Sequence, residues 1–77
     1  MVKAEGERQV LSRREELILR AAAAGMGSDK TAKQFGMTAY DVELTLRAVM
    51  TKLGARSRIE AVVTAVRSGL IDPPARE

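Results

Sequence analysis

The sequence contains no cysteine and no histidine. The chain therefore cannot form a disulfide or hold zinc in a cysteine or histidine site, and it cannot use a mechanism that needs a thiol or an imidazole. The absence of cysteine fits the reducing environment of a cytosol, so we expect a cytoplasmic protein. We expect no metal and no cofactor.

Long apolar runs are also missing. The longest stretch without a charge, residues 21–28, is too short and too rich in alanine and glycine to cross a bilayer. The first residues carry charges where a secretion signal would have an apolar segment, so we expect neither secretion nor a membrane partner. With 77 residues the chain makes one domain at most, near the lower limit for a stable core.

Positive charge is present in modest excess, with a net charge of +3 and an isoelectric point near 9.8. Between Glu43 and Glu60 every charged residue is basic. Such a block suits contact with nucleic acid, but it is equally compatible with a solvated face. The basic residues of this block are Arg47, Lys52, Arg56 and Arg58.

Four helices and no strand are predicted, so the fold class is all-α. Residues 1–10 are charged with little to bury and are predicted to be a flexible arm, and residues 72–77 contain two prolines and form a tail. The helical domain spans residues 11–71. Its helices are expected at about 13–24, 29–35, 39–53 and 58–68.

Each predicted helix begins at a residue suited to an N-cap, and each is followed by a glycine that stops it. Ser12 with Glu15 forms a capping box, in which each residue's side chain bonds the other's backbone amide. Similar pairs occur twice more along the chain. The caps are Ser12, Ser28, Thr38 and Ser57, and the stops are Gly25, Gly36, Gly54 and Gly69.

A short helix, a turn at residues 36–38 and a longer helix form the plan of a helix-turn-helix motif. An ordinary helical hairpin would show the same plan. Helical periodicity divides residues 39–53 into two faces. The stripe of Val42, Leu46, Val49, Met50 and Leu53 is predicted to face the core.

The opposite face of residues 39–53 is the candidate DNA surface, because residues early in a helix that enters the major groove reach base edges. A partly solvated helix side with one stray leucine is the plain alternative. The base-contacting candidates are Glu43, Leu44, Arg47 and Ala48. The backbone-contacting candidates are Lys30, Lys33, Tyr40, Thr51, Lys52, Arg56 and Arg58, although Arg58 could instead pair with Glu60 or brace the turn before the last helix.

The last helix is apolar over more than half of its circumference, which is wider than a helix that only caps a small core requires. This width predicts contact with the same helix of a second copy across a two-fold axis. An exposed Val63 without a role is the alternative. The predicted interface residues are Ile59, Val62, Val63 and Val66.

The segments Leu11-Ser-Arg-Arg-Glu15 and Lys52-Leu-Gly-Ala-Arg-Ser-Arg58, followed by Glu60-Ala61 and Gly69-Leu-Ile71, resemble the LuxR-type (GerE-type) DNA-binding domain. The resemblance runs without a gap from residue 11 to 71. It implies four helices, a recognition helix at residues 39–53, dimers made through the last helix, and a bacterial transcription regulator. The chain is similar either to stand-alone members or to an excised domain.

The sequence departs from the family pattern at the recognition helix. Asp41-Val42-Glu43 replaces the usual Thr-Val-Lys, Thr45 replaces a histidine, and Arg13 replaces a proline. Glu43 suits acceptance of a hydrogen bond from cytosine N4, but two carboxylates also place negative charge where phosphates crowd. Two functions therefore stay open: a dimeric, sequence-specific binder of double-stranded DNA, and a protein-interaction module that binds another regulator or RNA polymerase.

An enzyme is not expected. Asp41 and Glu43 are too close together on one helix to act as an acid–base pair across a cleft, and no nucleophile is arranged beside a base.

Overall fold

The computed structural model describes residues 11–73, which form four helices and no strand: α1 (Arg13–Ala23), α2 (Ser28–Phe35), α3 (Ala39–Leu53) and α4 (Arg58–Arg67). The predicted all-α, four-helix class is confirmed, and the helix bounds agree to within about one residue. The predicted arm at residues 1–10 and residues 74–77 of the predicted tail lie outside the described residues.

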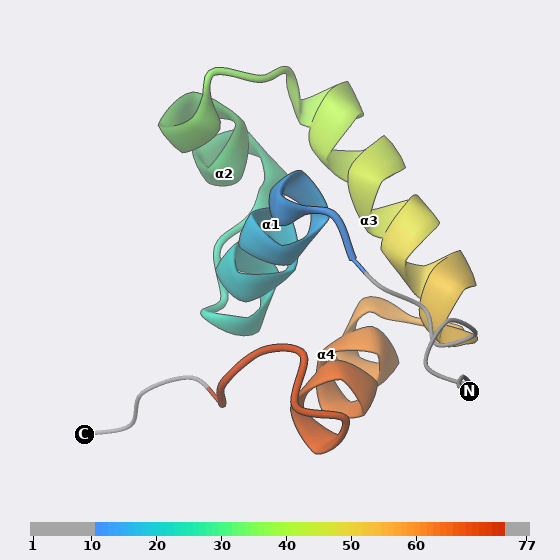
Figure 1. The fold of residues 1–77 in the computed structure, drawn as a ribbon. Helices are drawn as coiled ribbons and strands as arrows, with labels where there is room; N and C mark the ends of the chain where they lie inside the picture. The colour runs from blue at the N-terminus through green and yellow to red at the C-terminus, as the bar shows by residue number, and fades with distance from the viewer. Residues whose placement is uncertain (1–10, 74–77) are drawn as a thin grey trace.

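The longest helix, α3, packs against the other three helices and runs along one side of the molecule (Figure 1). α1 also contacts both α2 and α4. No helix within residues 11–73 is long and apolar enough to span a bilayer.

The core lies where α1, α3 and α4 meet. Ile18 and Leu19 from α1 are buried against the predicted inner stripe of α3, in which Val42, Leu46 and Val49 are at most 3% exposed. Met50 and Leu53 are partly buried and pack on the same cluster. The remaining buried members are Ala32 from α2, Ala61 and Ala65 from α4, and Ile71 after it.

Helix α1 begins with the predicted capping box. The Ser12 amide donates to Glu15 Oε1 at 2.9 Å, and the Glu15 amide donates to Ser12 Oγ at 3.1 Å. Thr38 and Ser57 cap α3 and α4 by accepting from the amide three residues on. In the described part of the chain their partners return no bond to the cap, so these are single caps and not full boxes.

The prediction that Ser28 caps α2 is wrong. Gly27 occupies the cap position with extended backbone, φ −75° and ψ 168°, and no side chain caps the helix. Ser28 is the first residue of the helix, and its hydroxyl turns to a residue of α3 instead.

All four helices end in the same way. In each, the residue that follows the predicted glycine donates a backbone hydrogen bond to a carbonyl five residues earlier, a pattern that closes a helix around one residue of positive φ. The four bonds run from Met26 to Ala21, Met37 to Ala32, Ala55 to Met50, and Leu70 to Ala65.

Candidate nucleic-acid interface

The turn between α2 and α3 sets the direction in which α3 begins. Gly36 has φ 67° and ψ 37°, a left-handed conformation that costs other residue types energy. The Met37 amide then bonds the Ala32 carbonyl at 2.9 Å, and Thr38 Oγ1 accepts from the Asp41 amide at 3.0 Å. These contacts hold the start of α3 close to the end of α2, while the buried stripe of α3 packs on the core and leaves the opposite side outward.

The outward side of α3 carries the predicted base-contacting residues. Tyr40 is 71% exposed and Leu44 is 43% exposed, so both present apolar surface to the solvent. Glu43, Arg47, Ala48 and Thr51 are also exposed. Within residues 11–73 no ion pair engages Arg47, so its guanidinium can meet an external acceptor.

The predicted backbone-contacting residues do not all have the same surroundings. Lys30 and Lys33 on α2, and Arg56 in the turn before α4, are exposed. The Arg56 amide donates to Glu60 Oε1 at 2.9 Å, which braces the start of α4. Glu60 is therefore engaged by the backbone of Arg56, and among the described residues the predicted alternative pairing with Arg58 does not occur.

Lys52, in contrast, is held by α1. Its Nζ lies 2.7 Å from Glu15 Oε1, in an ion pair whose side chains are 35% and 13% exposed. This pair ties the C-terminal end of α3 to the N-terminal end of α1. The Lys52 ammonium already donates to a carboxylate, so a phosphate contact by Lys52 would have to use its other N–H groups.

The Glu15 carboxyl group is tuned by these contacts. Burial on its own raises the pKa of Glu15, but hydrogen bonds from Lys52 Nζ and the Ser12 amide outweigh burial, and the resulting pKa lies below its ordinary value. The charged form of Glu15 is thus the form that the fold favours.

We expect Glu15→Gln to lower the free energy of unfolding by about 1 kcal/mol at pH 7, since glutamine keeps the cap but loses the ion pair. Because the folded-state pKa is lowered, this stabilisation exists above the unfolded-state pKa and disappears as the pH falls through the folded-state pKa. The difference from wild type should therefore shrink below about pH 4.3. Urea unfolding at a series of pH values measures it.

Glu16→Gln is the matched control, because Glu16 pairs with Arg20 along the exposed side of the same helix. We expect it to cost less than about 0.5 kcal/mol. A difference between wild type and the Glu15→Gln variant that stayed constant down to about pH 3 would contradict the assigned role of the Glu15 carboxylate.

Sequence reasoning missed a polar cluster that joins three helices. The Ser28 hydroxyl donates to Glu43 Oε2, and Arg58 Nη2 lies 3.3 Å from Ser28 Oγ and 3.8 Å from Glu43 Oε2. The sequence assigns Glu43 and Arg58 to base and backbone contact separately. The structure brings them together, although they lie on different helices.

The predicted dimer residues of α4 divide into two pairs. Ile59 and Val63 are 76% and 45% exposed, whereas Val62 and Val66 are partly buried and pack on the chain's own core. The exposed pair borders an open groove of about 440 Å³ that continues to the end of α1 and the segment after it. Apolar surface is thus available for a second copy at Ile59 and Val63.

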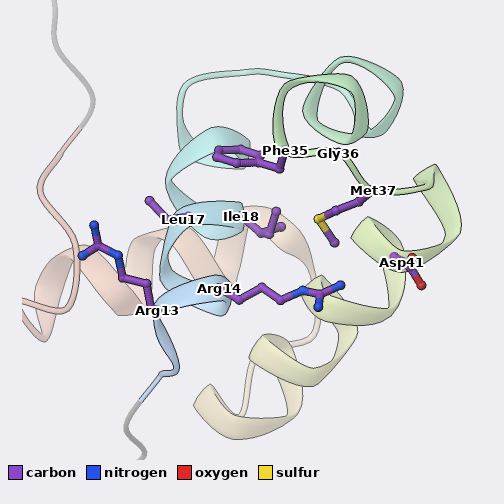
Figure 2. A pocket seen from close by; sticks show the side chains of 8 residues that line it. All are labelled: Arg13, Arg14, Leu17, Ile18, Phe35, Gly36, Met37 and Asp41. Atoms are coloured by element: carbon purple, nitrogen blue, oxygen red, sulfur yellow. The ribbon is translucent and has the colours of Figure 1, made fainter.

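A second groove, of about 550 Å³, lies between α1 and the turn of the motif. Arg13 and Arg14 point in opposite directions at its edge, and Arg14 extends toward α3 (Figure 2). No sequence pattern singles out this groove, because its lining comes from segments with unrelated periodicities. The lining residues are Arg13, Arg14, Leu17, Ile18, Phe35, Gly36, Met37 and Asp41.

A short helix, a glycine turn, and a longer helix with one buried and one exposed face define a helix-turn-helix domain. More specifically, the chain belongs to the family described as "Bacterial regulatory proteins, luxR family", whose model matches residues 9–65. The resemblance drawn from the sequence is confirmed.

Two relatives are named as regulators of transcription. The chain is 37% identical over 71 residues to "Transcriptional regulatory protein YdfI" of Bacillus subtilis, an alignment that covers 92% of this chain and 33% of that protein. It is 43% identical over 61 residues to "HTH-type transcriptional activator RamA" of Corynebacterium glutamicum, with coverage of 79% and 22%. The chain therefore spans about a third or less of these relatives.

Proposed function

We propose that this chain binds double-stranded DNA in a sequence-specific manner, as the DNA-reading domain of a bacterial transcription regulator in the cytoplasm. In this proposal α3 enters the major groove, and two copies associate through α4. The observation that carries the proposal is the outward face of α3, where Tyr40, Leu44 and Arg47 are exposed together. Membership of a family of bacterial regulatory proteins supports it.

Each exposed residue has a role that its chemistry suits. Arg47 offers a bidentate donor to guanine O6 and N7, and Leu44 and Ala48 offer apolar contact to thymine methyl groups. Tyr40, Thr51 and the exposed cations Lys30, Lys33 and Arg56 offer donors to phosphate, which fix orientation without reading sequence. Lys52 contributes mainly by fixing α3 on α1, with its positive charge close to the same surface.

The direct test is selection of bound sequences from a random duplex library, with the purified chain. We expect one enriched motif with two-fold symmetry, together with binding to random DNA that weakens as salt rises. No enrichment, combined with negligible binding at low salt, would overturn the proposal.

The second candidate function is a protein-interaction module, and the acidic residues of α3 favour it. Glu43 is exposed and Asp41 lies in the first turn of α3, so both carboxylates lie on the helix that would approach the phosphates. Another regulator or RNA polymerase would then contact the face that holds Tyr40 and Leu44. Under this function, wild type barely binds DNA at low salt, and Glu43→Lys creates weak binding without sequence preference.

We expect Arg47→Ala to weaken binding to the selected site by about 1–3 kcal/mol and to relax the preference at one base pair, because one bidentate base contact is lost. Binding to random duplex should weaken less. Fluorescence anisotropy with the selected duplex and its single-base variants measures both effects.

Arg67→Ala is the matched control, since Arg67 is an exposed arginine in the last turn of α4. We expect it to leave the base preference unchanged. An equal loss on selected and random duplexes for Arg47→Ala would assign Arg47 to the phosphate backbone and not to a base.

A further inference from the structure

The cluster of Ser28, Glu43 and Arg58 lies where α2, α3 and α4 meet. One carboxylate oxygen, Glu43 Oε2, accepts from the Ser28 hydroxyl and lies 3.8 Å from Arg58 Nη2. Arg58 Nη2 also donates to Ser28 Oγ at 3.3 Å. The serine thus bridges the two charged groups and holds Glu43 on the side of α3 that faces Arg58.

This ion pair is at the surface. The Glu43 side chain is 56% exposed and the Arg58 side chain is 44% exposed. Ion pairs this open to water are weak, and salt screens them. Separation of the two groups therefore costs little by itself and does not disturb the core.

Both members of the pair have an obvious competitor on DNA. A phosphate oxygen competes with Glu43 for the Arg58 guanidinium, and the cytosine N4 amino group competes with Arg58 for the Glu43 carboxylate. A phosphate on its own cannot easily take Arg58, because the carboxylate that remains nearby repels it. The exchange is favourable only where both competitors are present.

We propose that Glu43 is a specificity-determining residue, which withholds Arg58 from phosphate on random DNA and releases it when a cytosine in the bound site takes the carboxylate. This inference rests on the proposed DNA binding and adds a coupling between one base and one backbone contact. Discrimination then comes from a repulsive contact on wrong sequences as well as from an attractive contact on the right one.

This coupling predicts a specific salt dependence of DNA affinity. Each phosphate contact contributes about 0.9 to the slope of log affinity against log salt. Arg58 contributes to that slope on the selected duplex but not on random duplex as long as Glu43 is present. Removal of the Glu43 charge makes Arg58 contribute on both.

The experiment measures anisotropy-based affinities over a salt series, on the selected duplex and on random duplex. It uses wild type, Glu43→Gln, Arg58→Gln and the double variant. With Glu43 present, we expect Arg58→Gln to lower the slope magnitude by about one on the selected duplex and to leave it unchanged on random duplex. Glu43→Gln should strengthen binding to random duplex about 3- to 10-fold at low salt and raise the slope magnitude by about one, with both gains lost in the double variant.

Asp41→Asn is the matched control, because it removes a carboxylate from the same helix at a position outside the cluster. Any gain it gives on random DNA should be the same with and without Arg58, whereas the gain from Glu43→Gln should require Arg58. Thermal unfolding followed by circular dichroism establishes that all variants are folded at the assay temperature.

Failure of the coupling can be distinguished from failure of the proposed DNA binding. If Arg58→Gln lowers the slope equally on both duplexes in wild type, or if Glu43→Gln strengthens random binding equally without Arg58, the coupling is wrong and the DNA-binding function stands. If wild type shows no binding to either duplex at low salt, the proposed function fails and this inference fails with it.

Discussion

Val63→Asp is expected to reduce affinity for a duplex that carries both half-sites by about 100-fold or more, while affinity for a single half-site stays unchanged. Val63 is 45% exposed beside Ile59, so a carboxylate at this position is hydrated in the monomer. In a dimer formed through α4 the same carboxylate would lose its water and gain no hydrogen-bond donor, which opposes association. Linking two DNA-binding domains raises their affinity for a duplex with two half-sites by about two to four orders of magnitude, and that gain is lost when the dimer dissociates. Sedimentation on and off DNA reports the loss directly.

Two further variants separate interface from core. Val62→Asp should unfold the domain, because Val62 packs on the core, whereas Gln34→Asp adds the same charge at an exposed position of α2 and should leave assembly intact. A Val63→Asp protein that sediments and binds the two-half-site duplex like wild type would remove Val63 from the interface.

Leu19→Ala is expected to lower the free energy of unfolding by about 2–5 kcal/mol, because Leu19 is fully buried and the deletion leaves a cavity between α1 and the helices that pack on it. Domains are stabilised by roughly 0.05–0.15 kcal/mol per residue, about 4–12 kcal/mol for a chain of this length, so the loss is a large fraction of the stability. Urea unfolding measures it.

Leu44→Ala is the control for Leu19→Ala, since the same side chain is removed from an exposed position on α3. We expect a stability change within about 0.5 kcal/mol, with any loss confined to DNA affinity. Equal destabilisation by the two substitutions would contradict the assignment of one leucine to the core and the other to the binding face.

The parts of this fold that the sequence predicts are those specified by residues within about one helical turn of each other. The box of Ser12 and Glu15, the glycine stops, and the alternation of buried Val49 with exposed Ala48 are all local patterns. Each follows from helix geometry alone, so each could be predicted before the packing of the helices was known.

The contacts that sequence reasoning missed join residues far apart in the chain. Glu15 and Lys52 are separated by 37 positions and Ser28 and Arg58 by 30, and helical periodicity carries no information on which side chains of separate helices meet. A local rule assigns Ser28 to a cap. Gly27 takes that position, and the serine hydroxyl is left for a contact with α3 that only the tertiary fold creates.

Tyr40, described above as an exposed residue near the start of α3, is the one tyrosine of a chain that contains no tryptophan. Most of the emission from the protein under ultraviolet excitation therefore originates at a single place, on the exposed face of α3 that is proposed to bind DNA. A macromolecule that covers this face changes the surroundings of the only strong emitter in the chain. The protein thus carries its own optical reporter, and occupancy of α3 can be followed on unlabelled material.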